Sequence, residues 1–199
     1  RTHLEDAVPI TVFQEINAWA STLNKTLLHL KDSEKHLYEL GLGGTAAGTG
    51  ITTEPEYKQL VEKHLREITK INELYISEDT VEMTQSSDAL GIFSSGLKHL
   101  GLNFIKIAND LKLLNMGPKA GISEYKLPEV EPGSSIMPGK LNPSIAECVH
   151  MVGCQVIGND AAVQQGVRDG QLQLNVMTPM IAFNLEFSIR ILKNSASMF

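Results

Sequence analysis

Cysteine is scarce in this sequence, and basic residues are outnumbered by acidic ones. The 199 residues include 2 cysteines, 17 Lys and Arg, and 23 Asp and Glu, which gives a formal net charge of −6. The basic residues are scattered rather than clustered, which argues against a surface that follows the phosphates of a nucleic acid. We therefore expect no nucleic-acid partner.

Long apolar runs and targeting signals are also missing. No segment approaches the roughly 18 consecutive apolar residues of a transmembrane helix. The first residues lack the basic and then apolar plan of a signal peptide. The sequence therefore predicts a soluble, cytoplasmic protein with no membrane contact. Its 42% apolar residues can supply a sizeable core for one domain.

The two cysteines, Cys148 and Cys154, fall within one predicted helix. Their spacing corresponds to a rise of about 9 Å along a helix, which is too far for a disulfide. We predict that both are reduced thiols that pack in the core and that neither binds a metal.

Helical periodicity dominates the chain, and no segment keeps the alternation of a strand. Apolar residues recur every three or four positions in helices predicted at residues 11–40, 53–69, 90–114, 143–169 and 173–199. Thr11 and Gln14 form a capping-box pair at the first start, and Pro179 should kink the last helix or set its true start. The prediction is an all-α, elongated bundle of about five long helices in one domain, residues 1–199.

The helix predicted at residues 90–114 carries an apolar seam, a row of apolar residues along one side, that suits packing against several partners, within the chain or across subunits. The seam consists of Leu90, Phe93, Leu97, Leu100, Phe104, Ile107, Leu111 and Leu114.

Two segments interrupt the helices. Residues 41–50 are rich in glycine and predict a compact turn between two helices; they lack the Gly-Lys-Ser/Thr of a phosphate-binding loop. Residues 115–142 show no sustained period and contain repeated Gly and Pro. Connections this long are uncommon unless they are functional or disordered.

The most informative stretch is GSSIMPGKLN at residues 133–142. Ser134 and Ser135 follow a glycine and offer hydroxyls and backbone N–H groups, Lys140 adds a positive charge, and Asn142 stands where a helix begins. This combination suits a carboxylate ligand. A surface linker with a solvated lysine explains the same composition, so composition alone leaves both readings open.

This stretch fills every fixed position of Gly-Ser-Ser-x-Met-Pro-x-Lys-x-Asn, and so resembles the signature of the fumarase/aspartase superfamily. The block THLEDA at residues 2–7 resembles the family's Thr-His-x-x-Asp-Ala, and GTAAGTG at 44–50 is similar to its Gly-Thr-Ala-x-Gly-Thr-Gly loop. The resemblance implies the central helical domain of that fold, without the family's N-terminal and C-terminal domains. A start without Met and an end inside a helical pattern also led us to expect a piece of a longer chain.

The resemblance implies a role for each residue of the motif. Ser134 would be the general base that removes a proton next to a carboxylate, and its oxyanion would need support from N–H groups and positive charge. Lys140 and Asn142 would bind the substrate carboxylate and stabilise the enediolate. Ser135 and Met137 would line the same pocket.

The second block would add Thr2 as a substrate-binding residue and His3 as a catalytic one. Glu147 matches the acidic partner of that histidine, and such a carboxylate fixes the imidazole tautomer and raises its pKa. Without the motif, His3 would be taken for a surface histidine near a chain end.

The leaving group has to be inferred from flanking residues. Residues 170–177 (GQLQLNVM) and Ala120 resemble the aspartase branch, which eliminates ammonia from aspartate to give fumarate. Gly44 is more typical of fumarases, which add water to fumarate, and Lys119 and Thr178 depart from the usual aspartase pattern. We expect aspartase chemistry, with class II fumarate hydratase as the alternative.

The resemblance also implies the cofactors and partners. The reaction requires no organic cofactor, although a divalent cation could activate it, and no metal site is expected in this chain. The substrate would be a small dicarboxylate, and a homotetramer would build each active site from three subunits. A catalytically silent helical oligomerisation segment is the alternative from another class.

Overall fold

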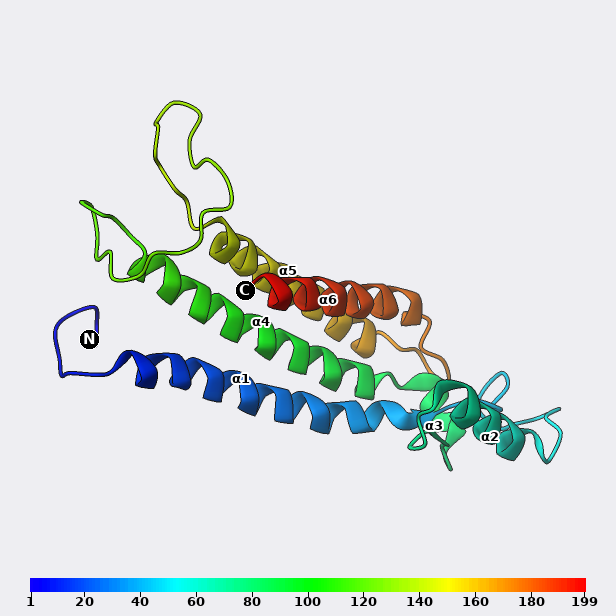
Figure 1. Cartoon of the computed structure of the whole chain (residues 1–199). Coiled ribbons are helices and arrows are strands. Elements are labelled where there is room, and N and C mark those ends of the chain that lie inside the picture. Colours follow the sequence, from blue (N-terminus) through cyan, green and yellow to red (C-terminus); the bar gives the residue numbers. More distant parts are fainter.

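The computed structural model describes all 199 residues and shows an elongated helical bundle. Four long helices lie side by side, and the shorter α2 and α3 lie together at one end (Figure 1). The α-helices are α1 (Val12–Glu34), α2 (Tyr57–Thr69), α3 (Thr80–Gln85), α4 (Asp88–Leu114), α5 (Ser144–Arg168) and α6 (Thr178–Met198). The predicted all-α fold is confirmed, and the five predicted helices are all present.

The first helix begins where it was predicted to begin but ends before the predicted residue 40. The Thr11 hydroxyl accepts a hydrogen bond from the Gln14 backbone N–H at 3.1 Å, and the Gln14 side chain accepts one from the Thr11 N–H at 3.0 Å. After Glu34 the chain tightens into a 3-10 helix, Lys35–Tyr38, and then forms the strand β1 (Glu39–Leu40). The prediction of one helix to residue 40 is therefore wrong for its last six residues.

Two short strands and one short helix were not predicted. β1 pairs in parallel with β2 (Tyr75–Ile76), so its backbone groups bond across the chain rather than along a helix. α3 follows β2 and is capped by the Asp79 carboxylate, which accepts from the N–H groups of Val81 and Glu82. Segments of two and six residues are too short to leave a readable period in the sequence.

The last helix starts at Thr178 rather than at residue 173. Pro179 occupies its first turn, where the missing N–H costs no helical hydrogen bond. Pro179 therefore sets the true start of this helix rather than kinking it, which is one of the two predicted alternatives. The preceding residues 170–177 form a turn instead, with hydrogen bonds between Gln171 and Leu174.

The core lies between α4, α5 and α6. Every residue of the predicted α4 seam is buried or half-buried, and Leu97, Phe104 and Ala108 pack with Val149 and Val156 of α5. α4 and α5 approach closely where two glycines meet: a Cβ on Gly153 would lie 2.8 Å from the Gly101 carbonyl oxygen. A larger residue there would push the two helices apart.

A polar cluster sits inside this otherwise apolar contact. Asp160 is only 3% exposed and accepts hydrogen bonds from Ser94 at 2.7 Å and from Gln164 at 3.1 Å, and it forms an ion pair with Lys98. Burial alone would raise the pKa of Asp160, but the hydrogen bonds from Lys98, Ser94 and Gln164 outweigh it and lower that pKa. Asp160 is therefore ionised and fully paired inside the bundle.

The surface departs from the sequence expectations in two places. Val12, Ile16 and Leu27 belong to the predicted apolar side of α1, yet they are 59%, 50% and 44% exposed. Cys148 and Cys154 are both free thiols, as predicted, but Cys154 is exposed rather than packed in the core. None of the helices combines the length and the apolar character that a membrane crossing would need.

We predict that Asp160→Asn lowers the free energy of unfolding by about 3 kcal/mol. This value is at the low end of the losses seen when a buried ion pair is broken, because the Lys98 side chain still reaches solvent. The folded pKa of Asp160 lies below its unfolded value of 3.8, so its contribution is present above that value and is lost as pH falls through the folded pKa. Denaturant unfolding at pH 7 and at pH 3 measures both effects. Asp32→Asn is the control, since Asp32 pairs with Lys35 in solvent and its loss should leave stability unchanged.

Candidate functional site

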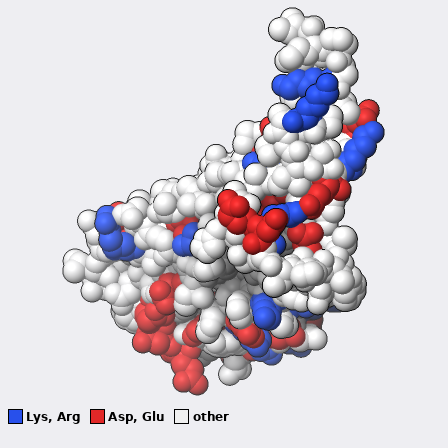
Figure 2. Space-filling model, turned by 90° about the vertical axis from the view of Figure 1, so that its left-hand side faces the viewer, with Lys and Arg blue, Asp and Glu red and all other residues white.

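The topology brings three parts of the chain to one end of the bundle. α1 and α5 begin at this end and α4 finishes there, so the N-terminal segment, the 115–142 loop and the start of α5 all meet solvent on the same side (Figure 1). These parts contain all the residues that the resemblance assigned to catalysis and substrate binding. The 115–142 loop projects from the bundle, and Figure 2, which views this end, shows positive side chains near its tip.

The Ser134 hydroxyl lies at the centre of a small turn. Its Oγ accepts backbone hydrogen bonds from the N–H of Ile136 at 3.3 Å and from the N–H of Met137 at 3.1 Å. Two peptide dipoles aimed at one oxygen stabilise negative charge on it, as an oxyanion hole does. This geometry supplies the N–H support that a serine base needs.

The other motif residues of this loop differ in their exposure to solvent. Ser135, Met137 and Lys140 are exposed, whereas Asn142 is half-buried. Lys140 is the only basic residue in 127–142, and it forms no ion pair within the chain. An exposed ammonium without an ion-pair partner can meet an anion that arrives from outside.

The loop that carries these residues is closed at its base. The Gly133 N–H donates to the Lys140 carbonyl oxygen at 2.9 Å, and the Asn142 side-chain amide donates to the Gly133 carbonyl oxygen at 3.0 Å. We call residues 133–142 the loop head, and these two hydrogen bonds its neck.

The Thr2–His3 block forms a separate turn at the N-terminus. Thr2 and Glu5 exchange backbone hydrogen bonds at 3.1 and 2.9 Å, and His3 stands at the turn with a φ of 56°, a left-handed conformation. His3 is exposed, and so is Glu147 in the first turn of α5. No hydrogen bond or ion pair joins the two within one chain, so the predicted His3–Glu147 pair stays a prediction.

The segment before the loop head is fastened to the bundle. The Tyr125 hydroxyl donates to the Glu15 carboxylate of α1 at 2.8 Å, and the Leu127 N–H donates to the Asn115 side chain at 2.9 Å. Arg1 forms an ion pair with Glu124. The hydrogen bond to Glu15 raises the pKa of Tyr125. No sequence pattern indicates this attachment, since Glu15 and Tyr125 are 110 residues apart and belong to no motif.

The stretch that resembles aspartases lies at the opposite end of the bundle. Residues 171–174 form an exposed turn after α5, and Leu172 has a φ of 51°. α5 has 25 residues, and at about 1.5 Å per residue it spans roughly 37 Å. Ser134 and this turn therefore cannot contact the same small substrate within one chain.

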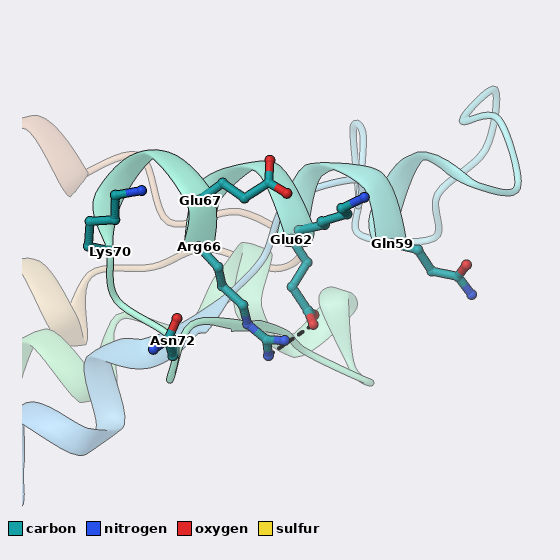
Figure 3. Close-up of a pocket in the computed structure, with 7 residues that line it drawn as sticks. Gln59, Glu62, Arg66, Glu67, Lys70 and Asn72 are labelled. Carbon is teal, nitrogen blue, oxygen red and sulfur yellow. Dashed lines mark ion pairs between the residues drawn. The ribbon is translucent and has the colours of Figure 1, made fainter.

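A polar cleft on α2 lies outside these segments. Glu62 and Arg66, two of the residues that line it, form an ion pair at 3.0 Å (Figure 3). Arg66 also donates to the Leu74 carbonyl at 2.6 Å, and Glu62 accepts from the Ile76 N–H at 2.8 Å. These contacts fasten β2 to α2, so the pair has a structural role. The chain contains no cluster of three or more His, Cys, Asp or Glu side chains that could hold a metal ion.

Comparison with known proteins gives consistent matches along the whole chain. Residues 1–158 match the family described as Lyase. An aspartate ammonia-lyase of Bacillus subtilis is 46% identical over 199 residues, which are 100% of this chain and 42% of that protein. A class II fumarate hydratase of Photorhabdus laumondii is also 46% identical over 199 residues, 100% of this chain and 43% of that protein.

The fold has solved counterparts. The crystal structure of a fumarate lyase:delta crystallin from Brucella melitensis, bound to cobalt, superposes with a TM-score of 0.94 at 44% identity, over 99% of this chain and 43% of that one. This likeness confirms the predicted fold of the central helical domain. The chain spans less than half the length of the relatives that it matches.

We predict that Tyr125→Phe loosens the segment before the loop head. A hydrogen bond to a carboxylate contributes about 1.5 kcal/mol, so amide hydrogen exchange in residues 116–127 should become roughly tenfold faster. Tyr57→Phe is the matched control, because Tyr57 is an exposed tyrosine of α2 with no hydrogen bond from its hydroxyl. Equal exchange rates in the two variants would show that the contact with Glu15 does not hold the segment.

Proposed function

Because this chain belongs to the lyase family that includes aspartate ammonia-lyases and class II fumarate hydratases, we propose that it is the central helical part of an aspartate ammonia-lyase. The observation that carries the proposal is the Ser134 turn, in which two N–H groups point at one hydroxyl oxygen. The reaction is the reversible elimination of ammonia from L-aspartate, which gives fumarate.

Ser134 acts as the general base. As an alkoxide held by the N–H groups of Ile136 and Met137, its Oγ takes the proton from the carbon next to the side-chain carboxylate of aspartate. The electron pair of that C–H bond moves into the carboxylate, which becomes an enediolate. When the pair returns, the double bond of fumarate forms, the C–N bond breaks and ammonia leaves.

Positive charge and polar groups stabilise the enediolate. Lys140 is exposed, and its carbonyl accepts from the N–H of Gly133, the residue before Ser134. Its long side chain can therefore bring an ammonium to the extra negative charge. Asn142 binds the same carboxylate through its amide, and Ser135 and Met137 line the pocket. Thr2 binds substrate, and His3, paired with Glu147, serves as a substrate-binding cation or a proton relay.

A homotetramer would complete the site. Within one chain, Ser134 and the exposed turn at 171–174 stand at opposite ends of α5, and His3 does not reach Glu147. Antiparallel packing of a second copy would bring opposite ends together. The apolar residues left exposed on α1, among them Phe13 at 75% and Leu28 at 62%, offer a surface for such a copy.

The choice of ammonia over water rests on residues 170–177 and Ala120, which resemble aspartases. Class II fumarate hydratase is the second candidate, since a relative of that name is as similar to the chain as the aspartate ammonia-lyase is. Neither reaction requires an organic cofactor. A divalent cation could act as an activator, and the related Brucella melitensis protein was crystallised with cobalt.

We expect the complete protein to release ammonia from L-aspartate at least 100-fold faster than it hydrates fumarate. Both activities can be followed by the absorbance of fumarate, with and without a divalent cation. Faster hydration would favour the fumarase alternative. If neither reaction is detected, the alternative of a catalytically silent helical oligomerisation segment is favoured.

We also expect Ser134→Ala to lower kcat by at least about 1,000-fold, because the general base is lost, while the oligomer remains assembled in size-exclusion chromatography. Ser123→Ala is the control from the same long loop, since the Ser123 hydroxyl makes no hydrogen bond and has no place in the site. Normal turnover of Ser134→Ala would show that another group is the base.

A further inference from the structure

The neck of the loop head depends on one side chain. Asn142 stands just before α5, and its amide donates to the Gly133 carbonyl oxygen at 3.0 Å. The Gly133 N–H in turn donates to the Lys140 carbonyl oxygen at 2.9 Å. Asn142 thus closes the loop by joining its last residue to its first.

Close packing at the neck leaves no room for a side chain on Gly133. An added Cβ would lie 2.5 Å from the Lys140 carbonyl oxygen and 2.9 Å from both the backbone nitrogen and the Oδ1 atom of Asn142. All three atoms belong to the closing side of the loop. The neck therefore requires glycine at 133 as well as an amide at 142.

The loop head is joined to the bundle by an arm with few contacts. The chain is fastened up to Leu127, and α5 begins at Ser144. Between Leu127 and Gly133, residues 128–132 make no hydrogen bond, and their only ion pair links Glu129 to the nearby Lys126. On its other side the loop head joins α5 directly through Pro143, whose carbonyl accepts from the Glu147 N–H at 3.0 Å. The loop head can therefore pivot about this junction while its own internal bonds hold.

We propose that Asn142 is a positioning residue that locks the loop head, so that the Ser134 base and the Lys140 ammonium move over the substrate as one fixed unit. The inference rests on the proposed function and assigns the Asn142 amide a task that precedes substrate binding. One of its N–H groups is engaged with Gly133 before any ligand arrives. Loss of the lock lets Ser134 and Lys140 separate, which slows the chemical step more than it weakens binding.

Tryptic cleavage after Lys140 tests the lock without substrate, because the carbonyl of the bond to be cleaved is itself part of the neck. In the complete protein, Asn142→Ala should raise the rate of cleavage between Lys140 and Leu141 roughly fivefold, the effect of losing one hydrogen bond. It should also lower kcat at least tenfold, a larger change than any rise in KM from the loss of the amide as a substrate ligand. Mass spectrometry of the fragments and steady-state kinetics give the two readouts.

Gly133→Ala opens the same neck from its other side and should reproduce both effects. The double variant should be no more impaired than the worse single variant, because each substitution removes the same interaction. Thermal unfolding identifies any variant that fails to fold, and Asn142→Ala tests the proposal alone if Gly133→Ala does fail. Val130→Ala, in the exposed arm, is the control and should leave both readouts unchanged.

Three outcomes separate the proposals. Faster cleavage with a lower kcat supports the lock. Unchanged cleavage with a raised KM in an active enzyme overturns it and leaves Asn142 as a substrate ligand only. A wild-type protein that is inactive toward both aspartate and fumarate defeats the proposed function, and the lock as a device for catalysis falls with it.

Discussion

The antiparallel contact between α4 and α5 is the constraint on which the rest of the structure depends. Gly101 and Gly153 let the two helices approach, and Asp160 fixes their register by accepting from groups on both. Since α4 ends where α5 begins, the connection between them must form at one end of the bundle. Residues 115–142 make this connection.

The loop divides into a fastened part and a free part. Up to Leu127 it is held by Tyr125 on Glu15 and by Asn115, whereas the loop head is held only to itself. Such a division suits a group that must be ordered internally and yet move over a substrate. In the proposed movement over a substrate, the helices would give the loop a rigid base and the neck would preserve the geometry around Ser134.

We propose that a single chain provides only part of a site. Ser134 has its N–H groups, but Lys140 and Ser135 face solvent, and nothing in the chain covers them. The 171–174 turn lies at the opposite end of α5, and His3 makes no hydrogen bond or ion pair with Glu147 within the same copy. The exposed apolar residues of α1 are consistent with packing against another copy, because their exposure to water is unfavourable in free energy. Assembly and catalysis are thus proposed to depend on the same packing of copies.

Local patterns in the sequence were enough to predict the four long helices and the shorter α2, the capping box at Thr11 and the glycine-rich turn at 41–50, because periodicity and capping depend on neighbouring residues. The motif at 133–142 likewise indicated the family by residue type and spacing alone, and it made Ser134 the candidate base. Only the tertiary structure could decide that β1 pairs with β2, that Tyr125 reaches Glu15, and that Asn142 closes on Gly133. It also placed residues 171–174 far from Ser134. These features depend on which distant atoms meet in space, and the order of residues along a chain does not state that.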